Sequence, residues 1–561
     1  MRNTVTIKRQ VYQLSLKLLF ICSYLFLSSN NIFSRIQAID SVVGILVFIL
    51  LWIIIAGSLI LFSLTKNNII KVLISACIVL IGIIGKSYFM ITSQYLTYSD
   101  FEGLIKVIGF VGEVIEQYPD EVLTSSLIGL TGLTGLLLPP SVSRKYITTQ
   151  YAIASMVCAI MMVSGVLYKR GGEGSNGLLD YNNLLSFSAI FLISSAFAEP
   201  APDRKKVTIS VKESTGLQNI IFIMDESIRG DYLDINNPQG IQTRFPENKH
   251  INFGIASSAA NCSASTNVTI RYGARRSSYL KDIKVNPSFW AYARKAGYST
   301  YYIDAQRTGG YLMNLMGKRE RSEIDNFVQI DSDVIPYDRD ILVAAKLKKL
   351  IQKEGKKFIF INKMGVHFPY EGKYPVNNKL YVPTMKHTYF GNKIDPDANE
   401  AKKPDLKISD VRNRAINSYK NALSWNVTQF FNVLLDKTDL GKTVIIYTSD
   451  HGQDFHEDGR PGWITHCRVV NASREEGMVP MVFISENKKL LAKLRKAASY
   501  NFNKVSHFNI FSTLLQFLGY HTDRKIDEYS VFDKLPDMNR QFISYFYTRF
   551  GKKTVWVSLD H

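Results

Sequence analysis

"NIIFIMDES", residues 219–227, is an apolar run that ends abruptly on two carboxylates, Asp225 and Glu226. A short apolar run without alternation is typical of a strand that is buried on both faces of a parallel sheet. Later runs have the same character, and they are "KFIFIN" (357–362), "TVIIYTS" (443–449) and "PMVFIS" (480–485). Because helical patterns separate these runs, we predict an α/β domain with a mainly parallel central sheet over residues 217–561.

The polar residues of this domain gather where the predicted strands end. Asp225 and Glu226 end the first run, "KMGVH" (363–367) follows the second, and Asp450 and His451 follow the third. Ligands of parallel sheets bind at the carboxyl ends of the strands, so we expect these side chains to lie close together. Carboxylate and imidazole groups are zinc ligands, and Glu226, Asp450 and His451 would leave one coordination position open. The alternative for "DHG" (450–452) alone is a solvent-facing turn.

A segment rich in small hydroxyl residues is the candidate for the nucleophile. It is "GIASSAANCSASTNVTIRYG", residues 254–273, and it leads into an apolar helical pattern. A hydroxyl at a helix N-terminus gains from the helix dipole when it ionises. Serine and threonine also cap helices at such positions, and one residue can cap while another attacks.

The first 170 residues have the composition of a membrane domain. Stretches of about 20 apolar residues, enough to cross a bilayer, lie near 11–30, 42–64, 69–92, 122–141 and 147–168. The basic residues of the short loops place the N-terminus in the cytoplasm and the chain after residue 170 outside, although Lys169 and Arg170 depart from this rule.

Between the membrane part and the α/β domain, residues 171–216 are expected to form an interfacial helix and a linker. "LLSFSAIFLISSAFA" (184–198) is short and rich in serine, which favours a helix at the membrane surface over a sixth span. "EPAPDRKK" (199–206) is the linker. We also expect an outer amphipathic helix near 100–118, within the five-span domain 1–170.

Charge and cysteine content narrow the class of protein. The 561 residues carry a net charge of +19, most of it beyond residue 200, which suits an anionic partner such as nucleic acid or an acidic membrane face. The five cysteines do not form the pattern of a disulfide framework.

Three motifs carry a family resemblance. "IMDESIRGDY" (223–232) resembles a hydrophobic strand followed by Gly-Glu-Thr, "TSDHG" (448–452) resembles Ser-Asp-His-Gly, and "KMGVHFPY" (363–370) resembles Gln-Met-Gly-Asn-His-Gly-Pro. These are the motifs of the membrane-bound phosphoethanolamine transferases that modify lipopolysaccharide in Gram-negative bacteria, members of the alkaline phosphatase and sulfatase superfamily. The resemblance implies zinc ligation by Glu226, Asp450 and His451. It also implies substrate contacts by His367 and His466.

The chain departs from the family at several positions. Asp225 stands where the family has glycine, and Asn362 replaces a second histidine. The lipid A enzymes have Ser-Cys-Gly-Thr with an attacking threonine, whereas this chain has "NCSAST" (261–266). Sulfatases keep a glycine ten residues after the nucleophile, and counting back from Gly273 gives Ser263 as nucleophile and fourth zinc ligand, with Ser265 as the alternative.

Two smaller expectations concern a pair of cysteines and one histidine. Cys262 and Cys467 each adjoin a candidate site residue, so they could be bridged or could be two free thiols. We expect His507, which opens a helix-like stretch, to cap a helix.

By resemblance, the chain is an inner-membrane, multi-pass enzyme with a periplasmic catalytic domain and a Zn²⁺ cofactor. It would transfer phosphoethanolamine from phosphatidylethanolamine to lipid A or another envelope glycan through a covalent phospho-enzyme. We expect a membrane-bound monomer that binds no nucleic acid. The alternatives are a phosphoglycerol transferase, a sulfatase- or phosphatase-like hydrolase, and a non-catalytic scaffold with a degenerate sulfatase-like domain.

Overall fold

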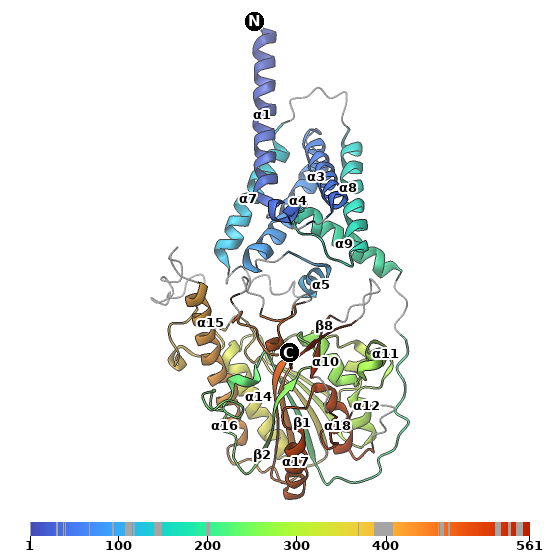
Figure 1. Cartoon of the computed structure of the whole chain (residues 1–561), viewed down its shortest axis with the longest axis vertical. Coiled ribbons are helices and arrows are strands. Elements are labelled where there is room, and N and C mark those ends of the chain that lie inside the picture. The colour runs from blue at the N-terminus through green and yellow to red at the C-terminus, as the bar shows by residue number, and fades with distance from the viewer. Residues whose placement is uncertain are drawn as a thin grey trace.

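The structure is a computed structural model in which a helical bundle and an α/β domain form the two ends of the molecule (Figure 1). It describes the whole chain except residues 1, 30–31, 38, 40, 67, 93–94, 107–114, 116–117, 140–147, 198–201, 369, 386–407, 458, 460–464, 469–471, 522–528, 537–539, 546–553 and 561. The expected fold class, a transmembrane helical domain followed by an α/β domain, is confirmed.

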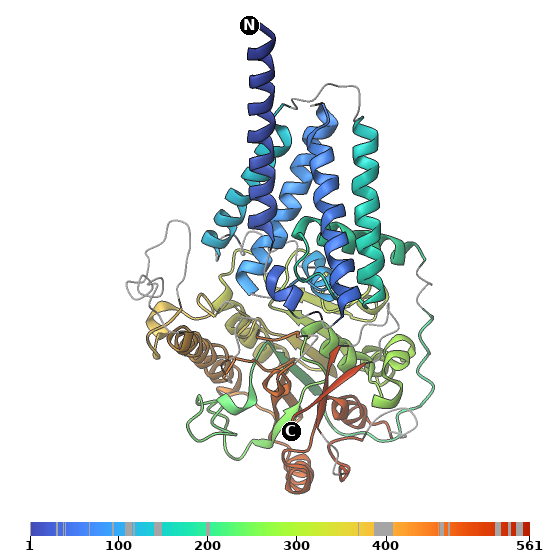
Figure 2. The same ribbon diagram turned by 45° about the horizontal axis from the view of Figure 1, so that its top comes forward.

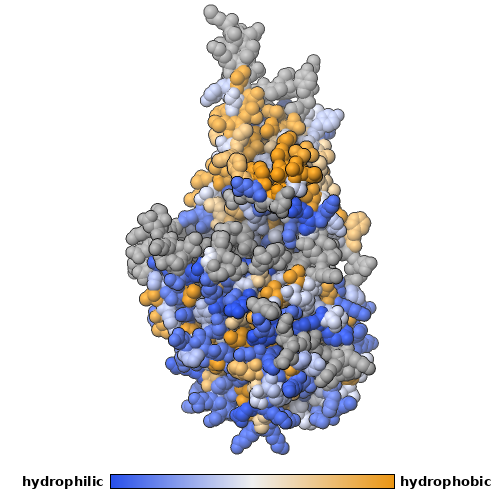
Figure 3. All heavy atoms as spheres, in the orientation of Figure 1, coloured by the Kyte–Doolittle hydropathy of each residue, from blue (hydrophilic) through white to orange (hydrophobic). Residues whose placement is uncertain are grey.

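The described helices of the N-terminal part are α1 (Arg2–Ser28), α2 (Ile32–Gln37), α3 (Val42–Ser63), α4 (Ile69–Thr92), α5 (Tyr98–Lys106), α7 (Pro119–Leu137), α8 (Thr149–Lys169) and α9 (Asp180–Ala196). Four described stretches are long and apolar enough to cross a membrane, namely Val11–Ser28, Val42–Ser63, Ile69–Ile91 and Thr149–Lys169. Their outward side chains give this part of the molecule an apolar surface, whereas the α/β domain is mostly hydrophilic (Figure 3).

The helix expected near 122–141 forms as α7 but is less apolar than the four candidate spans. Its glycines explain how it packs. A Cβ at Gly132 would lie 2.7 Å from the Tyr24 ring, and a Cβ at Gly135 would lie 2.7 Å from Ile21 Cγ1. Small residues at these positions let α7 approach α1 closely, as is common between membrane helices. The count of five spans stays a prediction.

Helix α9 corresponds to the expected interfacial helix. It packs against α4 and α8, and Figures 1 and 2 show it running across the end of the bundle that faces the α/β domain. The outer helix expected near 100–118 is described only in part. Helix α5 covers its beginning, and residues 107–114 and 116–117 lie outside the described residues.

The α/β domain is built on a seven-stranded sheet in the order β2-β7-β6-β1-β5-β3-β4. The strands are β1 (Asn219–Asp225), β2 (His250–Ser257), β3 (Ser299–Asp304), β4 (Asn326–Gln329), β5 (Lys357–Asn362), β6 (Thr443–Ser449) and β7 (Met478–Ser485). Strands β6, β1, β5, β3 and β4 are mutually parallel, so the mainly parallel sheet is confirmed. A separate two-stranded sheet pairs β8 (Gln541–Tyr545) with β9 (Val555–Ser558).

The strand at 480–485 is the exception to the parallel arrangement. It forms within β7, which runs antiparallel to both β6 and β2. An uninterrupted apolar run reflects burial on both faces of a sheet and contains no information about strand direction. The sequence pattern therefore predicted the strand but not its orientation.

Helices cover both faces of the sheet. They are α10 (Ser263–Tyr272), α11 (Tyr279–Val285), α12 (Phe289–Lys295), α13 (Lys318–Arg321), α14 (Pro336–Ile351), α15 (Ile408–Leu423), α16 (Phe430–Leu435), α17 (Lys488–Asn501) and α18 (Ile510–Phe517). Because side chains alternate along a strand, Phe222 of β1 packs into one core with α12, α17 and α18, whereas Ile223 packs into the other with α14, α15 and α16. Because helices pack on both faces of β1, the carboxyl end of this central strand is held in a fixed position.

Candidate metal and nucleophile site

Three potential metal ligands meet at the carboxyl ends of β1 and β6. Glu226 follows β1 directly, and Asp450 and His451 follow β6, the parallel neighbour of β1. One ligand atom from each side chain lies within 4.8 Å of the other two. His451 Nε2 is 3.4 Å from Glu226 Oε1 and 3.6 Å from Asp450 Oδ2. All three residues are buried, so solvent would screen a cation between them only weakly.

The hydrogen bonds around this cluster leave suitable ligand atoms available. Asp450 Oδ1 accepts the N–H groups of Ser227 (2.9 Å) and His451 (2.8 Å), whereas Asp450 Oδ2 is buried without a hydrogen-bond partner among the described residues. His451 Nδ1 lies 2.8 Å from the Gly452 carbonyl oxygen, which favours a proton on Nδ1 and leaves the Nε2 lone pair for a metal. An unpartnered carboxylate oxygen, a second carboxylate and an imidazole nitrogen fit Zn²⁺.

The charges of the cluster influence one another strongly. Burial, and then the charge of Glu226, raise the pKa of Asp450 to about 7. Burial by itself would lower the pKa of His451, but Asp450 and Glu226 outweigh burial and raise this pKa to about 9. Without a cation the cluster therefore retains protons at neutral pH, and a metal ion has to displace them in order to bind.

The hydroxyl of Ser263 lies against this set of ligands. Ser263 is the first residue of α10, and its Oγ is 3.4 Å from both Glu226 Oε2 and His451 Nε2. The N-terminus of a helix carries a partial positive charge, which favours an ionised oxygen there. Ser263 Oγ thus lies where a fourth ligand of the candidate metal site would lie, and the side chain is half-buried rather than sealed from solvent.

The neighbouring hydroxyls have different surroundings. Thr266 Oγ1 donates to the Ala260 carbonyl (3.0 Å) and accepts the Ala260 N–H (3.1 Å), so it holds the turn before α10 together. Ser265 is buried, and within the described part of the chain it makes no hydrogen bond to Glu226 or His451. The geometry therefore favours Ser263 over the alternative Ser265 as the nucleophile.

The two candidate substrate histidines, His466 and His367, lie next to His451 in a row that ends at the exposed His367. The rings of His451 and His466 stack with centroids 4.2 Å apart, and the centroids of His466 and His367 are 6.0 Å apart. Beside the exposed His367, the ring of Phe368 stacks on Tyr118, which precedes α7 of the bundle, at 6.5 Å. The site therefore faces the membrane part of the chain.

Comparison with known proteins places this arrangement in a family. The sulfatase family model matches residues 218–520, which contain every site residue described above except Tyr118 of the bundle.

The chain belongs to the sulfatase family.

The resemblance to phosphoethanolamine transferases is confirmed by similarity to individual members. Kdo(2)-lipid A phosphoethanolamine 7''-transferase of Escherichia coli (strain K12) is 22% identical over 377 residues, which cover 62% of this chain and 61% of that relative. Phosphoethanolamine transferase EptA of the same strain is 25% identical over 177 residues, 30% of this chain and 29% of the relative. The alignments thus span less than two thirds of either relative.

A solved structure shows that the fold is shared over almost the whole chain. It is the integral membrane protein lipooligosaccharide phosphoethanolamine transferase A (EptA) from Neisseria meningitidis. The TM-score is 0.59 at 17% identity, and the match covers 91% of this chain and 97% of that one. Both the bundle and the sulfatase domain therefore have counterparts in one known protein.

A buried ion pair lies behind the candidate metal ligands of this sulfatase family member. Lys363 Nζ lies 2.5 Å from Asp225 Oδ2, and neither side chain is exposed. Asp225 Oδ1 accepts the N–H of Glu226 (3.0 Å), and Tyr447 Oη donates to Asp225 Oδ2 (3.0 Å). The Asp225 carboxylate therefore fixes the backbone of the candidate ligand Glu226.

Two further residues that contact the ligands were not identified from the sequence. Gln306, two positions after β3, donates to Glu226 Oε2 (3.1 Å) and to the Lys363 carbonyl (2.7 Å). Ser227 Oγ donates to Glu226 Oε1 (2.7 Å). The sequence contained one signal for Gln306, namely its position just beyond the carboxyl end of a strand.

Cys262 and Cys467 form a disulfide across 205 positions of sequence. The Cys467 N–H also donates to the Asn261 carbonyl (2.8 Å). Because Cys262 precedes Ser263 and Cys467 follows His466, the bond ties the start of α10 to the loop that carries His466. Of the two possibilities left open by the sequence, the structure has the bridged pair.

The prediction that His507 caps a helix was wrong. Ser506 occupies the cap position, and His507 is buried. Its Nδ1 accepts the Ala259 N–H (3.2 Å), and its Nε2 lies 2.8 Å from Thr448 Oγ1. Burial lowers the pKa of His507 to about 3, so the ring stays neutral and supports the turn before α10.

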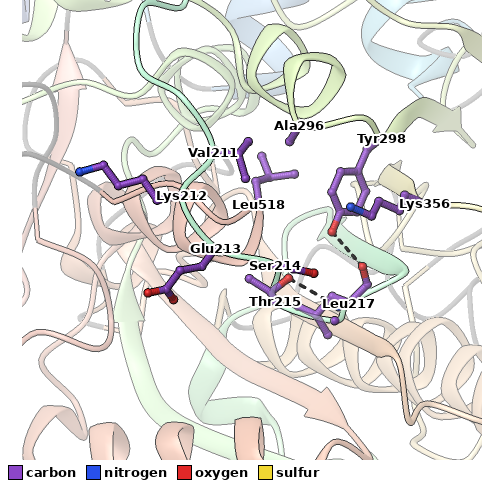
Figure 4. A pocket seen from close by; sticks show the side chains of 11 residues that line it. Val211, Lys212, Glu213, Ser214, Thr215, Leu217, Ala296, Tyr298, Lys356 and Leu518 are labelled. Carbon is purple, nitrogen blue, oxygen red and sulfur yellow. Dashed lines mark hydrogen bonds between the residues drawn. The ribbon is translucent and has the colours of Figure 1, made fainter.

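A cavity of about 200 Å³ lies at the end of the sheet opposite to the candidate metal site. Figure 4 shows it between the linker 211–217, Tyr298 and Lys356. Leu217 and Lys356 precede β1 and β5, so this cavity lies at the amino ends of the strands. The metal ligands lie at the carboxyl ends, and the cavity is therefore separate from the candidate site.

Proposed function

We propose that this chain transfers phosphoethanolamine from phosphatidylethanolamine to lipid A or another cell-envelope glycan. The observation that carries the proposal is the position of Ser263 Oγ, 3.4 Å from Glu226 Oε2 and from His451 Nε2 at the start of α10. A serine beside candidate metal ligands, in a domain that faces a membrane bundle, suits the transfer of a head group from a lipid donor. The relatives named above are phosphoethanolamine transferases, which supports phosphoethanolamine as the group that is transferred.

In the first step Ser263 Oγ attacks the phosphorus of the donor. A bond forms between Ser263 Oγ and phosphorus, and the bond from phosphorus to the diacylglycerol oxygen breaks. The serine proton ends on the departing diacylglycerol hydroxyl. His466 stacks on His451, and His367 lies beyond it, so these rings are placed to bind the phosphate oxygens or to move this proton.

In the second step the acceptor takes the group from the enzyme. A hydroxyl of the glycan attacks the phosphorus, the bond from phosphorus to Ser263 Oγ breaks, and the proton of the acceptor hydroxyl returns to the serine. Two displacements through one side chain let donor and acceptor use the same site in turn. The exposed His367 lies at the mouth of this site.

The metal assignment follows from the ligand atoms. Glu226, Asp450, His451 and Ser263 would hold a Zn²⁺ ion. When bound, zinc supplies positive charge that lowers the pKa of the serine hydroxyl and stabilises the developing charge on phosphate.

We infer that the α/β domain lies in the periplasm of a Gram-negative cell. The disulfide between Cys262 and Cys467 supports an oxidising compartment, because cytosolic reductants keep such thiols reduced. The apolar helices support anchorage in the inner membrane. We propose that the chain acts as a monomer.

A trapping experiment tests this function. The full chain in detergent is incubated with phosphatidylethanolamine and no acceptor, digested, and examined by mass spectrometry. The proposal predicts one phosphoethanolamine group on Ser263 together with released diacylglycerol. A parallel incubation with phosphatidylglycerol tests the alternative donor, and a phosphoglycerol group on Ser263 in that sample alone would mean phosphoglycerol transfer. Full activity of Ser263→Ala with either donor would overturn covalent catalysis by this residue.

A further inference from the structure

The loop between α8 and α9 has an unusual glycine-rich sequence, "RGGEGSNG", residues 170–177. It follows the end of α8 that faces the α/β domain (Figure 2). The loop is firmly held, because Trp52 Nε1 donates to the Gly177 carbonyl (2.7 Å) and Ser175 Oγ donates to the Leu96 carbonyl (2.6 Å). A loop built in this way is a fixed structural element at the membrane boundary.

Two arginines lie against this loop. Arg35 comes from α2, and Arg170 is the C-cap of α8. A Cβ at Gly174 would lie 2.8 Å from Arg170 Cδ and Nε, and a Cβ at Gly177 would lie 3.0 Å from Arg35 Cγ. Both glycines have positive φ, +101° and +80°. Glycine is therefore required for the backbone to pass this closely beside the two side chains.

The described residues do not balance the positive charge of this pair. Among the residues that the structure describes, neither guanidinium has a carboxylate within 4.0 Å, and Arg35 Nε is buried without a hydrogen-bond partner. Burial, and then the charge of Arg170, lower the pKa of Arg35. Arg170 is also one of the two residues that depart from the expected distribution of basic residues across the membrane. Two neighbouring cations without a counter-charge repel each other, and a bound anion would stabilise them.

The backbone of the loop adds further donors. Within the described residues, the N–H groups of Gly174, Asn176 and Gly177 donate no hydrogen bond. Successive N–H groups in turns with positive φ form a concave site for anions. Arginine binds phosphate with paired, charge-assisted hydrogen bonds. The guanidinium groups and the backbone N–H groups together could donate hydrogen bonds to the oxygens of one phosphate group in a lipid headgroup.

We propose that Arg35, Arg170 and the loop 171–177 bind the phosphodiester of a phospholipid headgroup, in the leaflet that faces the α/β domain. Basic pockets at the ends of membrane helices are a recurrent way of holding lipid headgroups. Binding here does not require the transfer reaction proposed above, because no residue of the metal and nucleophile site takes part.

Lipid binding can be measured directly on the full chain. Protein freed of lipid in detergent is titrated with phosphatidylethanolamine or phosphatidylglycerol, and bound lipid is counted by native mass spectrometry. The variants are Arg170→Ala and the double variant Arg35→Ala/Arg170→Ala. Since a hydrogen bond to a charged group is worth about tenfold or more in affinity, each substitution should raise the half-saturating lipid concentration by at least about that factor.

Lys169→Ala is the matched control, because Lys169 is an exposed neighbouring cation and is not among the side chains nearest to Gly174 or Gly177. It should leave lipid binding unchanged. Arg170 is exposed, so Arg170→Ala keeps the question answerable even if loss of Arg35 impairs folding. Equal losses for both lipids support recognition of the shared phosphodiester, and a loss for one lipid assigns the site to that headgroup. Unchanged binding in Arg170→Ala, or an equal loss in Lys169→Ala, would overturn the proposal.

Discussion

Replacing Lys363 by methionine tests whether the buried ion pair supports the metal site. Lys363 Nζ contacts Asp225 Oδ2 at 2.5 Å, donates to the Asn426 carbonyl at 2.7 Å and lies 3.7 Å from Asp340 Oδ2. Methionine keeps much of the volume and removes the charge. Asp225 would then stay buried with only the Tyr447 hydroxyl and one backbone N–H as partners.

The size of the effect follows from the burial of both partners. Leaving one member of a fully buried pair uncompensated costs about 3–5 kcal/mol. Should Asp225 instead take up a proton in the folded state, the cost at pH 7 is about 1.4 kcal/mol, because burial already raises the pKa of Asp225 to about 6 beside Lys363, roughly one unit below pH 7. For a domain of about 300 residues, a loss of about 3–5 kcal/mol lowers the unfolding midpoint by roughly 5–8 °C, and the smaller loss lowers it by about 2–3 °C.

Thermal unfolding of the full chain in detergent, followed by tryptophan fluorescence, measures this loss. A carboxyl with a raised folded-state pKa destabilises the fold increasingly as pH rises until that pKa is passed. Because the pKa of Asp225 is about 6 with Lys363 present, the defect of Lys363→Met should shrink by about 1.4 kcal/mol between pH 7 and pH 6 and change little below pH 6. Metal analysis of the same samples should show reduced zinc, because Asp225 Oδ1 fixes the backbone of Glu226.

Two further variants serve as controls. Lys348→Met breaks a solvent-exposed pair with Asp436 (3.3 Å) and should cost less than about 1 kcal/mol. Adding Asp225→Asn to Lys363→Met removes the stranded charge and should restore part of the stability. A Lys363→Met protein as stable as Lys348→Met, or a double variant less stable than the single one, would refute the reasoning.

Other measurements address the nucleophile, the metal and the disulfide. Ser263→Ala should reduce transfer of phosphoethanolamine by at least about a thousandfold, whereas Ser265→Ala should retain most activity; a quantitative transfer assay that ranks them in the opposite order would contradict the assignment. Because the pKa values of Asp450 and His451 are raised to about 7 and 9 in the cation-free cluster, zinc must displace protons. Its affinity, measured by calorimetry, should rise about tenfold per pH unit between pH 7 and 9, and an affinity independent of pH would be inconsistent with this ligand set. Cys262→Ser should destabilise the fold by up to about 5 kcal/mol, because the bond closes a loop of 205 positions. Unfolding that is insensitive to reductant would show that the bond does not stabilise the protein.

Much of the site could be predicted because its ligands follow strands directly. A buried parallel strand is visible as an apolar run, and its carboxyl end is a general location for ligands. Glu226, Asp450 and His451 were therefore predicted from sequence, and the structure brings them together. The helices of the membrane part were equally visible, since the length and composition of an apolar run are local properties.

The remaining features depend on residues that are far apart in the sequence. The family spacing already favoured Ser263 over Ser265, but the contacts of Ser263 Oγ with Glu226 and His451 depend on the tertiary structure, and the role of Gln306 needed the pairing of β3 with β5. The direction of β7 depends on how the chain returns to the sheet, which its apolar pattern does not contain.

Sequence by itself determined the membrane helices, the parallel core strands and the strand-end ligands, because burial and hydrogen bonding impose these patterns on short segments. Only the tertiary structure decided the disulfide, the Asp225–Lys363 pair and the two arginines beside the glycine-rich loop. In each of these cases, the bond or charge cluster forms because folding brings together residues that are more than a hundred positions apart in the sequence. A polar residue in a sequence has many possible partners, and packing of the whole chain selects one.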